Sequence, residues 1–412
     1  MAAQKLIVFI YLPNETVAVP AGVFTHDDSP GLGAFAYGRR YVERDNALPV
    51  DPVSLPLGGP PPPEVLSNGG IYGAFRDAAP DYWGRLVIAA QAKVPPEALS
   101  EFDYLLASNA TRVGNLDFRL SPEDPEPALQ PPQFNQLAGL IEAAARIEAG
   151  ERAEEHLLQL LRQGTSMGGA RPKCTVLWNE ALWIAKFPAR GDSLNIPRIE
   201  YATMTLAGLC GIRIPEIAIV TVGDKDIFLS RRFDRKRAGD GWLRRGFVSG
   251  LSLMQWDERD RLRWGYPEMA DVMRRHMEVG EIRALYRRLI FNILVRNTDD
   301  HPRNHGFLRE SGGRLTLSPA YDLVPSLALA GVGSDFRLAM AIGEQGREAT
   351  LENALSRAAR FGLSDKEARD IIGQLLEIVS GWREHFAGCG LSGRELEMLE
   401  PSFSRCAQGM AE

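Results

Sequence analysis

Cysteine is scarce in this sequence of 412 residues, which contains only four: Cys174, Cys210, Cys389 and Cys406. None of them forms a C-x-x-C pair, so the sequence indicates neither a disulfide framework nor a cysteine zinc site, and a reducing cytoplasm fits best. Histidine is scarce as well, with six in the chain and no H-x-x-x-H pair on a predicted helix. Zinc binding is therefore disfavoured. A hydrolase triad is not indicated either, because no serine and histidine are placed in the sequence in a pattern typical of such a triad.

Long apolar runs and an excess of basic charge are also missing. The longest apolar runs, Ile217–Val220 and Leu289–Val295, are far shorter than the ~20 residues that a membrane helix needs. The segment Met1–Tyr11 lacks the long apolar stretch and cleavage site of a signal peptide, and we predict a first strand there. The net charge is −6 and the pI about 5.7, so no global basic field points to nucleic acid. We expect a cytoplasmic protein without membrane contact.

The first third of the chain has the pattern of a small, mostly antiparallel sheet. Short β-like runs at Leu6–Tyr11, Thr16–Pro20 and Gly33–Tyr37 are separated by Gly- and Pro-containing turns. The Pro-rich acidic run Ser121–Pro132 is typical of an extended linker. We therefore predict a β-rich N-terminal subdomain over residues 1–125.

The middle and last thirds differ in periodicity. After a helical pattern over residues 134–162, the runs 174–178, 182–187, 198–209, 217–222 and 226–230 predict strand, strand, helix, strand, strand. This is the order of a kinase N-lobe, which we place at 134–245. Helical periodicity dominates residues 246–412, with the best cases at 266–276, 279–296, 351–361 and 365–386. The prediction is an α+β, protein-kinase-like bilobal fold with a helical C-lobe.

One loop carries the residue types of phosphoryl transfer. Asp299 and Asn304 are five positions apart after an apolar run, and Asp322 follows 23 positions after Asp299. The spacing is that of the kinase catalytic loop, H-R-D-x-x-x-x-N. Asp299 is then the candidate base, whereas Asp300 is one residue out of register. Asn304 and Asp322 offer the hard oxygen ligands that Mg²⁺ prefers. Such residues also cluster in ordinary turns, so the hypothesis depends on the upstream elements.

Each upstream element is a weak signal by itself, but the elements follow one another along the chain in the order found in kinases. Lys186 ends a predicted strand and is the candidate phosphate ligand, although an edge-strand lysine would look the same. Glu200 is its candidate ion-pair partner, or a glutamate favoured by the helix dipole. The small-residue loop that precedes these strands could approach phosphates through backbone amides. It includes Gly168, Gly169, Ala170, Arg171 and Lys173.

The segment Ser230–Arg235 follows the fourth of these strands, at the position of a kinase hinge. There the backbone of residues 231–233 would read an adenine edge, and Asp234 could face the ribose hydroxyls. A charged surface loop is the alternative. These elements occur in the order that a kinase requires: the small-residue loop, the lysine, the glutamate, the hinge, the Asp–Asn pair and the late Asp. We therefore favour the kinase hypothesis.

Together these residues resemble the HipA toxin kinases of bacterial HipBA toxin–antitoxin modules. The similarity lies in Ser166–Lys173, Arg232–Arg235, Asn297–Asn304 and Pro319–Asp322, and Phe75–Asp81 resembles the family's F-x-D-x-L-P-D signature. The resemblance implies that Asp299 is the base, that Asn304 and Asp322 bind Mg²⁺, and that ATP is the phosphate donor. It further implies nucleotide contacts from Lys186, Arg231, Phe233, Asp234, His301 and Tyr321, and autophosphorylation of Ser166 that inactivates the kinase.

The resemblance also implies partners. Family members phosphorylate aminoacyl-tRNA synthetases and are neutralised by a HipB-like helix-turn-helix antitoxin, so DNA would be reached only through that antitoxin. We therefore expect a serine/threonine kinase toxin. Two alternatives stay open: a small-molecule kinase on a related fold, and a catalytically weak co-repressor that acts through a DNA-bound antitoxin.

Overall fold

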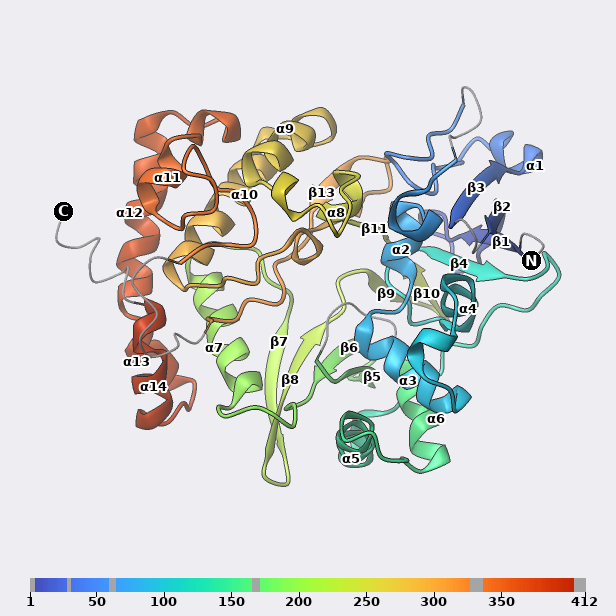
Figure 1. Cartoon of the computed structure of the whole chain (residues 1–412), viewed down its shortest axis with the longest axis horizontal. Helices are drawn as coiled ribbons and strands as arrows, with labels where there is room; N and C mark the ends of the chain where they lie inside the picture. Colours follow the sequence, from blue (N-terminus) through green and yellow to red (C-terminus); the bar gives the residue numbers. More distant parts are fainter. Residues whose placement is uncertain (1–3, 28–30, 59–63, 165–170, 327–335, 404–412) are drawn as a thin grey trace. The chain divides into compact units, whose positions relative to one another are not determined.

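The computed structural model describes residues 4–27, 31–58, 64–164, 171–326 and 336–403. The chain divides into two compact units, and each passes through the sequence more than once. Unit 1 comprises Met1–Gly191, Val220–Asp257 and Leu308–Gly313; unit 2 comprises Asp192–Ile219, Glu258–Phe307 and Arg314–Glu412. The elements are labelled along the chain in Figure 1. The predicted three-part division at 1–125, 134–245 and 246–412 is a different partition and stays a prediction.

Unit 1 begins with an antiparallel sheet of order β3-β2-β1-β4. Alternate residues of β1, Leu6, Val8 and Ile10, are fully buried, as expected for a strand with one face on a core. A bulge between Val8 and Phe9 shifts the register against β2. The strands are β1 Gln4–Ile10, β2 Val19–Asp27, β3 Leu32–Tyr37 and β4 Leu116–Arg119.

Short helices pack on this sheet through an aromatic cluster. The fully buried ring of Phe75, on α2, makes edge-to-face contacts with Phe24, Phe35, Tyr72 and Phe118, with centroids 5.1–5.7 Å away. Such pairs add to the burial of apolar area. The helices of this part are α1 Arg39–Val42, α2 Gly73–Ala78, α3 Tyr82–Ala92 and α4 Glu101–Ala107, with 3₁₀ turns η1 Ser67–Gly70 and η2 Pro96–Ala98.

A second four-stranded sheet has the order β5-β6-β8-β7. The turn joining β5 to β6 places Asn179 and Glu180 at φ +48° and +58°, as a tight hairpin requires. A smaller hairpin, β9–β10, follows. The bounds are β5 Lys173–Trp178, β6 Ala181–Lys186, β7 Ile217–Val222, β8 Lys225–Arg231, β9 Arg235–Ala238, β10 Gly241–Arg244, β11 Gly246–Ser249 and α8 Gly250–Leu253.

The continuous helical pattern predicted over residues 134–162 is broken in the structure. The 3₁₀ turn η3 Phe134–Gln136 leads into α5 Leu137–Glu148, and α6 Glu155–Gly164 begins only after a loop. Gly150 adopts φ +70° in that loop, a conformation that glycine reaches without strain and that ends a helix. The two helices pack on each other, as Figure 1 shows.

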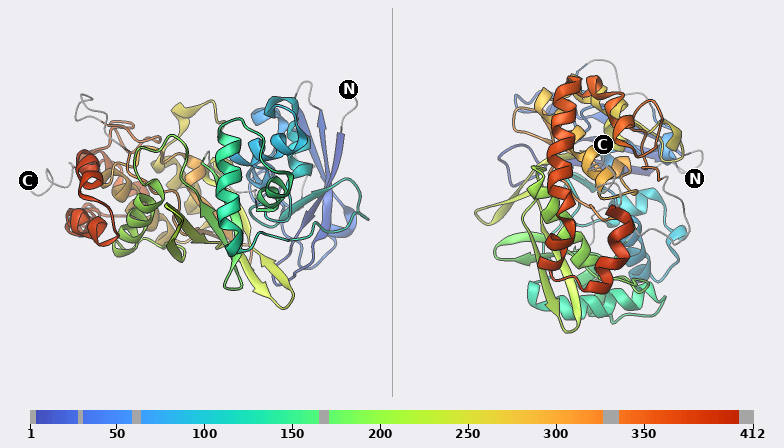
Figure 2. Two further views of the ribbon diagram at one scale, coloured as in Figure 1. Left: turned by 90° about the horizontal axis from the view of Figure 1, so that it is seen from below. Right: turned by 90° about the vertical axis from the view of Figure 1, so that its left-hand side faces the viewer.

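Unit 2 is mainly helical around α10, whose residues Leu285, Leu289, Ile290 and Ile293 are fully buried. The long helix α12 packs against α10 and is the orange-red helix at the front of the second view in Figure 2. The helices are α7 Ile196–Leu209, α9 Tyr266–His276, α10 Val279–Leu294, α11 Leu351–Leu355, α12 Asp365–Ser380, α13 Trp382–Gly388 and α14 Gly393–Leu399. The remaining elements of the chain are strand β12 Gly306–Arg309, which is divided between the two units, strand β13 Leu315–Leu317 and 3₁₀ turns η4 Arg261–Arg263, η5 Pro302–Asn304, η6 Ala358–Phe361 and η7 Glu400–Phe403.

Two of the predicted C-terminal helices are shorter than the sequence pattern indicates. The segment 365–386 is divided at Gly381, between α12 and α13, and the segment 351–361 is α11 followed by η6. Apolar periodicity continues across both breaks, so it did not reveal them. Within the described residues, no helix combines the length and apolar character needed to cross a membrane.

Candidate active site

The predicted catalytic loop follows α10 and is held by hydrogen bonds of both its backbone and its side chains. Asn297 donates from its backbone N and its side-chain Nδ2 to the O (2.9 Å) and Oδ1 (3.1 Å) of Asn292 on α10. Asn304, at the end of η5, donates from Nδ2 to the backbone O of Asp299 at 2.8 Å. The Asp299 side chain itself is 85% exposed, with His301 Nε2 3.9 Å from its Oδ1. The loop therefore presents a carboxylate to solvent from an ordered backbone.

The segment that contains Asp322 is fastened to this loop at several points. The Tyr321 hydroxyl donates to the backbone O of Arg303 at 2.7 Å. The backbone N of Ser318 donates to Gly306 O at 2.8 Å, and that of Ser326 to Arg296 O at 2.9 Å. The hydrogen bonds on both sides of Asp322 thus hold its segment alongside the loop of Asp299 and Asn304. The structure thus brings the two predicted segments together in unit 2.

Asp322 has an unusual backbone, with φ +56°. Aspartate tolerates the left-handed region better than most residues, but the conformation is still uncommon outside glycine. Strained backbone of this kind is concentrated at functional sites, where the surrounding structure over-determines it. The hydrogen bonds of Tyr321 and Ser326 supply that surrounding constraint.

The donor set of this region suits a hard cation. Because Asn304 donates through Nδ2, its amide oxygen is the atom left to act as a ligand, and Asp322 adds a carboxylate. One or two protein oxygens are what Mg²⁺ commonly takes beside phosphate and water. His305, the nearest buried imidazole in sequence, does not suit the role of proton donor. Burial and the neighbouring Arg288 lower the pKa of His305 to about 3.

Lys173, which we predicted to contact the nucleotide, is paired inside the protein, and its nucleotide contact stays a prediction. Its side chain is buried in unit 1, and its Nζ lies 3.1 Å from Asp81 Oδ2. The other oxygen of Asp81 accepts the backbone N–H of Gly84 at 2.6 Å and caps α3. A buried lysine needs such a partner, because an unpaired buried charge is costly. The structure thus joins two separate sequence motifs, Phe75–Asp81 and Ser166–Lys173, by one ion pair.

Asp234 also differs from expectation: its geometry contradicts a direct ribose contact. The side chain is 1% exposed, and its oxygens accept hydrogen bonds from Arg232 (2.9 and 2.7 Å), Arg235 (2.8 Å) and the backbone N of Gly114 (3.0 Å). Burial alone would raise the pKa of Asp234, but the two guanidinium groups outweigh it and lower the pKa. Asp234 is therefore the centre of a buried ion cluster that fixes the end of β8. Sequence reasoning missed this because two flanking arginines are equally typical of a surface loop.

The cluster leads to a prediction for Asp234→Asn. Neutralising the carboxylate leaves two buried guanidinium groups without their counter-charge, so we expect a loss of about 3–5 kcal/mol of folding free energy. The affinity of the remaining folded protein for ATP should change little. Thermal unfolding and nucleotide titration, beside the exposed control Asp240→Asn, measure the two effects. A variant of unchanged stability with weakened ATP binding would restore the ribose assignment.

The remaining predicted residues of unit 1 lie near the end of the second sheet. Lys186 ends β6, and its Nζ is 5.7 Å from the ring centroid of Phe228 on the neighbouring β8. Arg231 is the exposed last residue of β8, Phe233 is partly exposed, and Arg171 is partly exposed before β5. Their nucleotide contacts stay predictions. So does the ion pair of Lys186 with Glu200, a buried residue of α7 in unit 2.

Ser166, Gly168, Gly169 and Ala170 lie outside the described residues. The described elements on either side of them argue against one alternative chemistry, that of a hydrolase. Residues 164–168 read Gly-Thr-Ser-Met-Gly, which fits the G-x-S-x-G elbow of hydrolases. That elbow needs a strand followed by a helix. Here the helix α6 precedes the segment and the strand β5 follows it, which is the opposite order.

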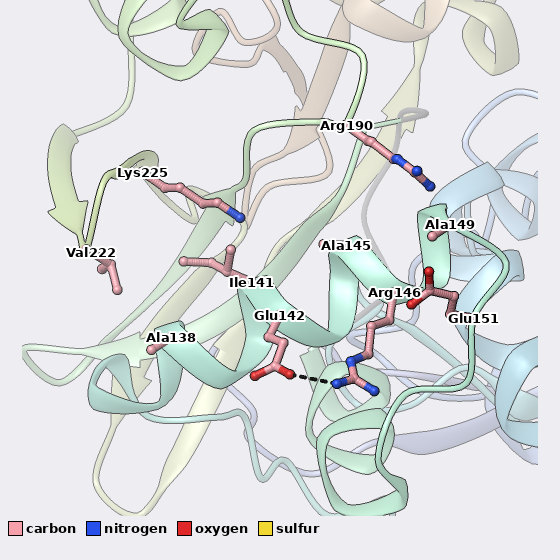
Figure 3. Close-up of a pocket in the computed structure, with 11 residues that line it drawn as sticks. Ala138, Ile141, Glu142, Ala145, Arg146, Ala149, Glu151, Arg190, Val222 and Lys225 are labelled. Carbon is pink, nitrogen blue, oxygen red and sulfur yellow. Dashed lines mark hydrogen bonds and ion pairs between the residues drawn. The ribbon is translucent and has the colours of Figure 1, made fainter.

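A separate hollow of about 520 Å³ lies in unit 1 beside α5 and the turn between β7 and β8. Figure 3 shows Ile141 and the alanines of α5 along it, with Lys225 pointing towards Ile141. Glu142 and Arg146 on its rim form an ion pair at 3.1 Å. None of the predicted nucleotide or catalytic residues lines it, so it is distinct from the candidate site.

The chain is similar in sequence to proteins that are named as putative kinases. A Sinorhizobium fredii protein named "Putative kinase Y4mE" is 24% identical over 351 residues, which cover 79% of this chain and 79% of that protein. A second protein of the same organism, "Putative kinase Y4dM", is 27% identical over 157 residues, covering 35% of this chain and 37% of its own length.

The fold has a match among solved structures. A chain of the Shewanella oneidensis MR-1 toxin–antitoxin complex of HipA, HipB and operator DNA superposes with a TM-score of 0.70 and 18% identity, covering 98% of this chain and 97% of that chain. The predicted α+β, protein-kinase-like fold class is thereby confirmed. The family model described as the HipA-like C-terminal domain matches residues 165–382, more than half of the sequence. The chain belongs to the HipA-like C-terminal domain family.

Proposed function

We propose that this protein is a Mg·ATP-dependent serine/threonine protein kinase and the toxin of a type II toxin–antitoxin system. The observation that carries the proposal is that hydrogen bonds hold the Asp322 segment alongside the loop of Asp299 and Asn304. Tyr321, Ser318 and Ser326 donate these hydrogen bonds. A kinase needs a base and two metal ligands held in fixed relation, because phosphoryl transfer is catalysed mainly by positioning and electrostatics. The names of the Sinorhizobium relatives support a kinase.

Asp299 would act as the general base. Its carboxylate accepts the proton of a substrate hydroxyl while that oxygen bonds to the γ-phosphorus, the bond to the β-phosphate oxygen breaks, and ADP leaves. Exposure of the carboxylate allows a large substrate to reach it. Lys186, at the end of β6, is the proposed cation for the phosphates. Mg²⁺ held by the Asn304 amide oxygen and the Asp322 carboxylate would offset phosphate charge.

The proposed partners follow from family membership and from the solved complex. That complex contains HipB and operator DNA, and we propose a HipB-like helix-turn-helix antitoxin for this chain, with DNA reached only through it in the cytoplasm. The proposed substrate is a translation component such as an aminoacyl-tRNA synthetase. Kinase assays with purified candidate synthetases and with the antitoxin added would test both assignments.

We also propose that Ser166 is the autophosphorylated, inactivating residue. Active protein incubated with Mg·ATP should gain one phosphate on Ser166, and Ser166→Ala should never carry it. The neighbouring variant Thr165→Ala is the matched control and should still be phosphorylated at Ser166. Peptide mass spectrometry reads the result. Phosphate on Thr165, or none on Ser166 in a preparation that labels other proteins, would contradict the assignment.

A further inference from the structure

Among the described residues, no hydrogen bond of its own side chain holds Asp299 in place. The carboxylate is 85% exposed, and the 3.9 Å separation from His301 is too long for a hydrogen bond. Its position must therefore come from the backbone of the loop. Misplacement of a catalytic group by about 1 Å can cost roughly 10²-fold in rate. The contacts of the adjacent residue, Asp300, show how that backbone is held.

Asp300 is buried although it neighbours an exposed aspartate. Its side chain is 1% exposed; Oδ2 accepts the Tyr266 hydroxyl at 2.6 Å, and Oδ1 accepts the backbone N–H of Ala339 at 2.8 Å. The Tyr266 oxygen in turn accepts Nδ2 of Asn292, on α10, at 2.9 Å. Asn292 is also the residue to which Asn297 is bonded. One network thus ties the first turn of α9, the helix α10 and the catalytic loop, all within unit 2.

We propose that Tyr266 is a positioning residue for the base: by holding the Asp300 carboxylate it fixes the backbone from which Asp299 projects. The inference rests on the proposed kinase function and deepens it. A buried tyrosine–carboxylate pair is a costly way to gain stability, because burying a carboxylate costs free energy even when it is hydrogen-bonded. Its placement next to the base, rather than elsewhere in the core, is explained by loop positioning.

The chain contains a matched control in Tyr286. Tyr286, on α10, is also fully buried, and its hydroxyl has no hydrogen-bond partner among the described residues. Both tyrosines can be changed to phenylalanine with removal of one oxygen and no change of ring. Tyr286→Phe removes an unpaired hydroxyl, whereas Tyr266→Phe removes the hydroxyl that holds Asp300.

The first test measures steady-state kinetics and thermal unfolding of both variants. We expect Tyr266→Phe to lower kcat roughly tenfold with KM for ATP within about twofold, and Tyr286→Phe to change neither. A Tyr266→Phe enzyme with wild-type kcat would overturn the proposal. So would a loss of activity that only follows a lower folded fraction, or an equal loss in Tyr286→Phe.

A second measurement, independent of activity, is hydrogen exchange of the loop amides. Exchange at residues 297–301 should be faster in Tyr266→Phe than in wild type and unchanged in Tyr286→Phe, since local opening governs protection. Equal protection in all three proteins would overturn the proposal. Wild-type protein that transfers no phosphate at all would instead remove the proposed function, and the exchange experiment would still decide whether Tyr266 holds the loop.

The pH profile gives a third readout. Burial raises the pKa of Asp300 to about 7, against the lowering effect of the hydrogen bonds from Tyr266 and Ala339, while the charge of Asp299 raises it further. Among the described residues, Arg288 and the buried His305 are further ionisable groups that lie around Tyr266. Ionised Asp300 accepts both hydrogen bonds more strongly, so kcat should rise through pH 7. Asp300→Asn should lack that rise; an identical profile would count against the role.

Discussion

Replacing Asp299 by glutamine is expected to lower the rate of phosphoryl transfer on the order of 10²–10⁴-fold, the range that general-base catalysis contributes. The amide has no basic oxygen for the substrate proton. Affinity for Mg·ATP should stay within about twofold, because the proposed metal ligands and Lys186 are untouched. The fold should also be unaffected, since the side chain is 85% exposed and exposed substitutions usually change stability by less than about 0.5 kcal/mol.

The combination of lost transfer with intact binding is what identifies a base. Phosphate incorporation and nucleotide titration on one preparation measure the two quantities, and thermal unfolding verifies the fold. Asp365→Asn, an exposed aspartate paired with Arg369 on α12, is the matched control and should behave as wild type. If Asp299→Gln kept most of the wild-type rate, the base would have to be another group.

The second large effect is expected for Asp322→Asn. Asparagine tolerates the left-handed backbone of this position, φ +56°, about as well as aspartate does. The substitution therefore removes the negative charge without the backbone strain that alanine would introduce. Affinity for ATP in the presence of Mg²⁺ should fall at least roughly tenfold, because a carboxylate ligand is lost. Affinity for ATP without Mg²⁺ should change little.

The informative quantity is the difference between the ATP affinity measured with Mg²⁺ and the ATP affinity measured without it. Asp224→Asn, in the exposed turn between β7 and β8, controls for the loss of one negative charge and should leave both affinities unchanged. An Asp322→Asn protein whose ATP affinity responds to Mg²⁺ as strongly as the wild type would contradict the ligand assignment.

The sequence alone predicted the elements that depend on local pattern. The strands around Lys186, the helices beginning at Tyr266 and Val279, and the fold class all followed from periodicity and turn residues. Helix breaks at Gly150 and Gly381 did not. Apolar spacing continues across Gly381, and Gly150 is flanked on both sides by the helix-forming residues Ala, Glu and Arg. Periodicity reports which face is buried, and it is insensitive to one residue that changes backbone direction.

At the candidate site, the buried contacts of the predicted residues could not be foreseen for a different reason. Asp234 and Lys173 were assigned by their place in a motif, but their charges are neutralised inside the protein by Arg232, Arg235 and Asp81. Asp81 is distant from Lys173 in sequence, and arginines near Asp234 are as typical of a surface loop as of a buried cluster. Only the folded chain shows these pairs. The pair of Tyr266 and Asp300 was missed for the same reason. Residues whose role comes from exposure and spacing, such as Asp299, were easier to identify than residues whose role comes from burial.

The central claim is that this chain transfers phosphate to protein through the loop of Asp299. The most direct test incubates wild type and Asp299→Gln with γ-labelled ATP, Mg²⁺ and cell lysate. With wild type we expect label on Ser166 and on a discrete lysate protein, and with the variant we expect label on neither. Wild-type protein that is free of phosphate at Ser166 beforehand, yet labels nothing, would contradict the claim and favour a co-repressor that acts only through its antitoxin. Label confined to a small molecule would contradict it in favour of a small-molecule kinase.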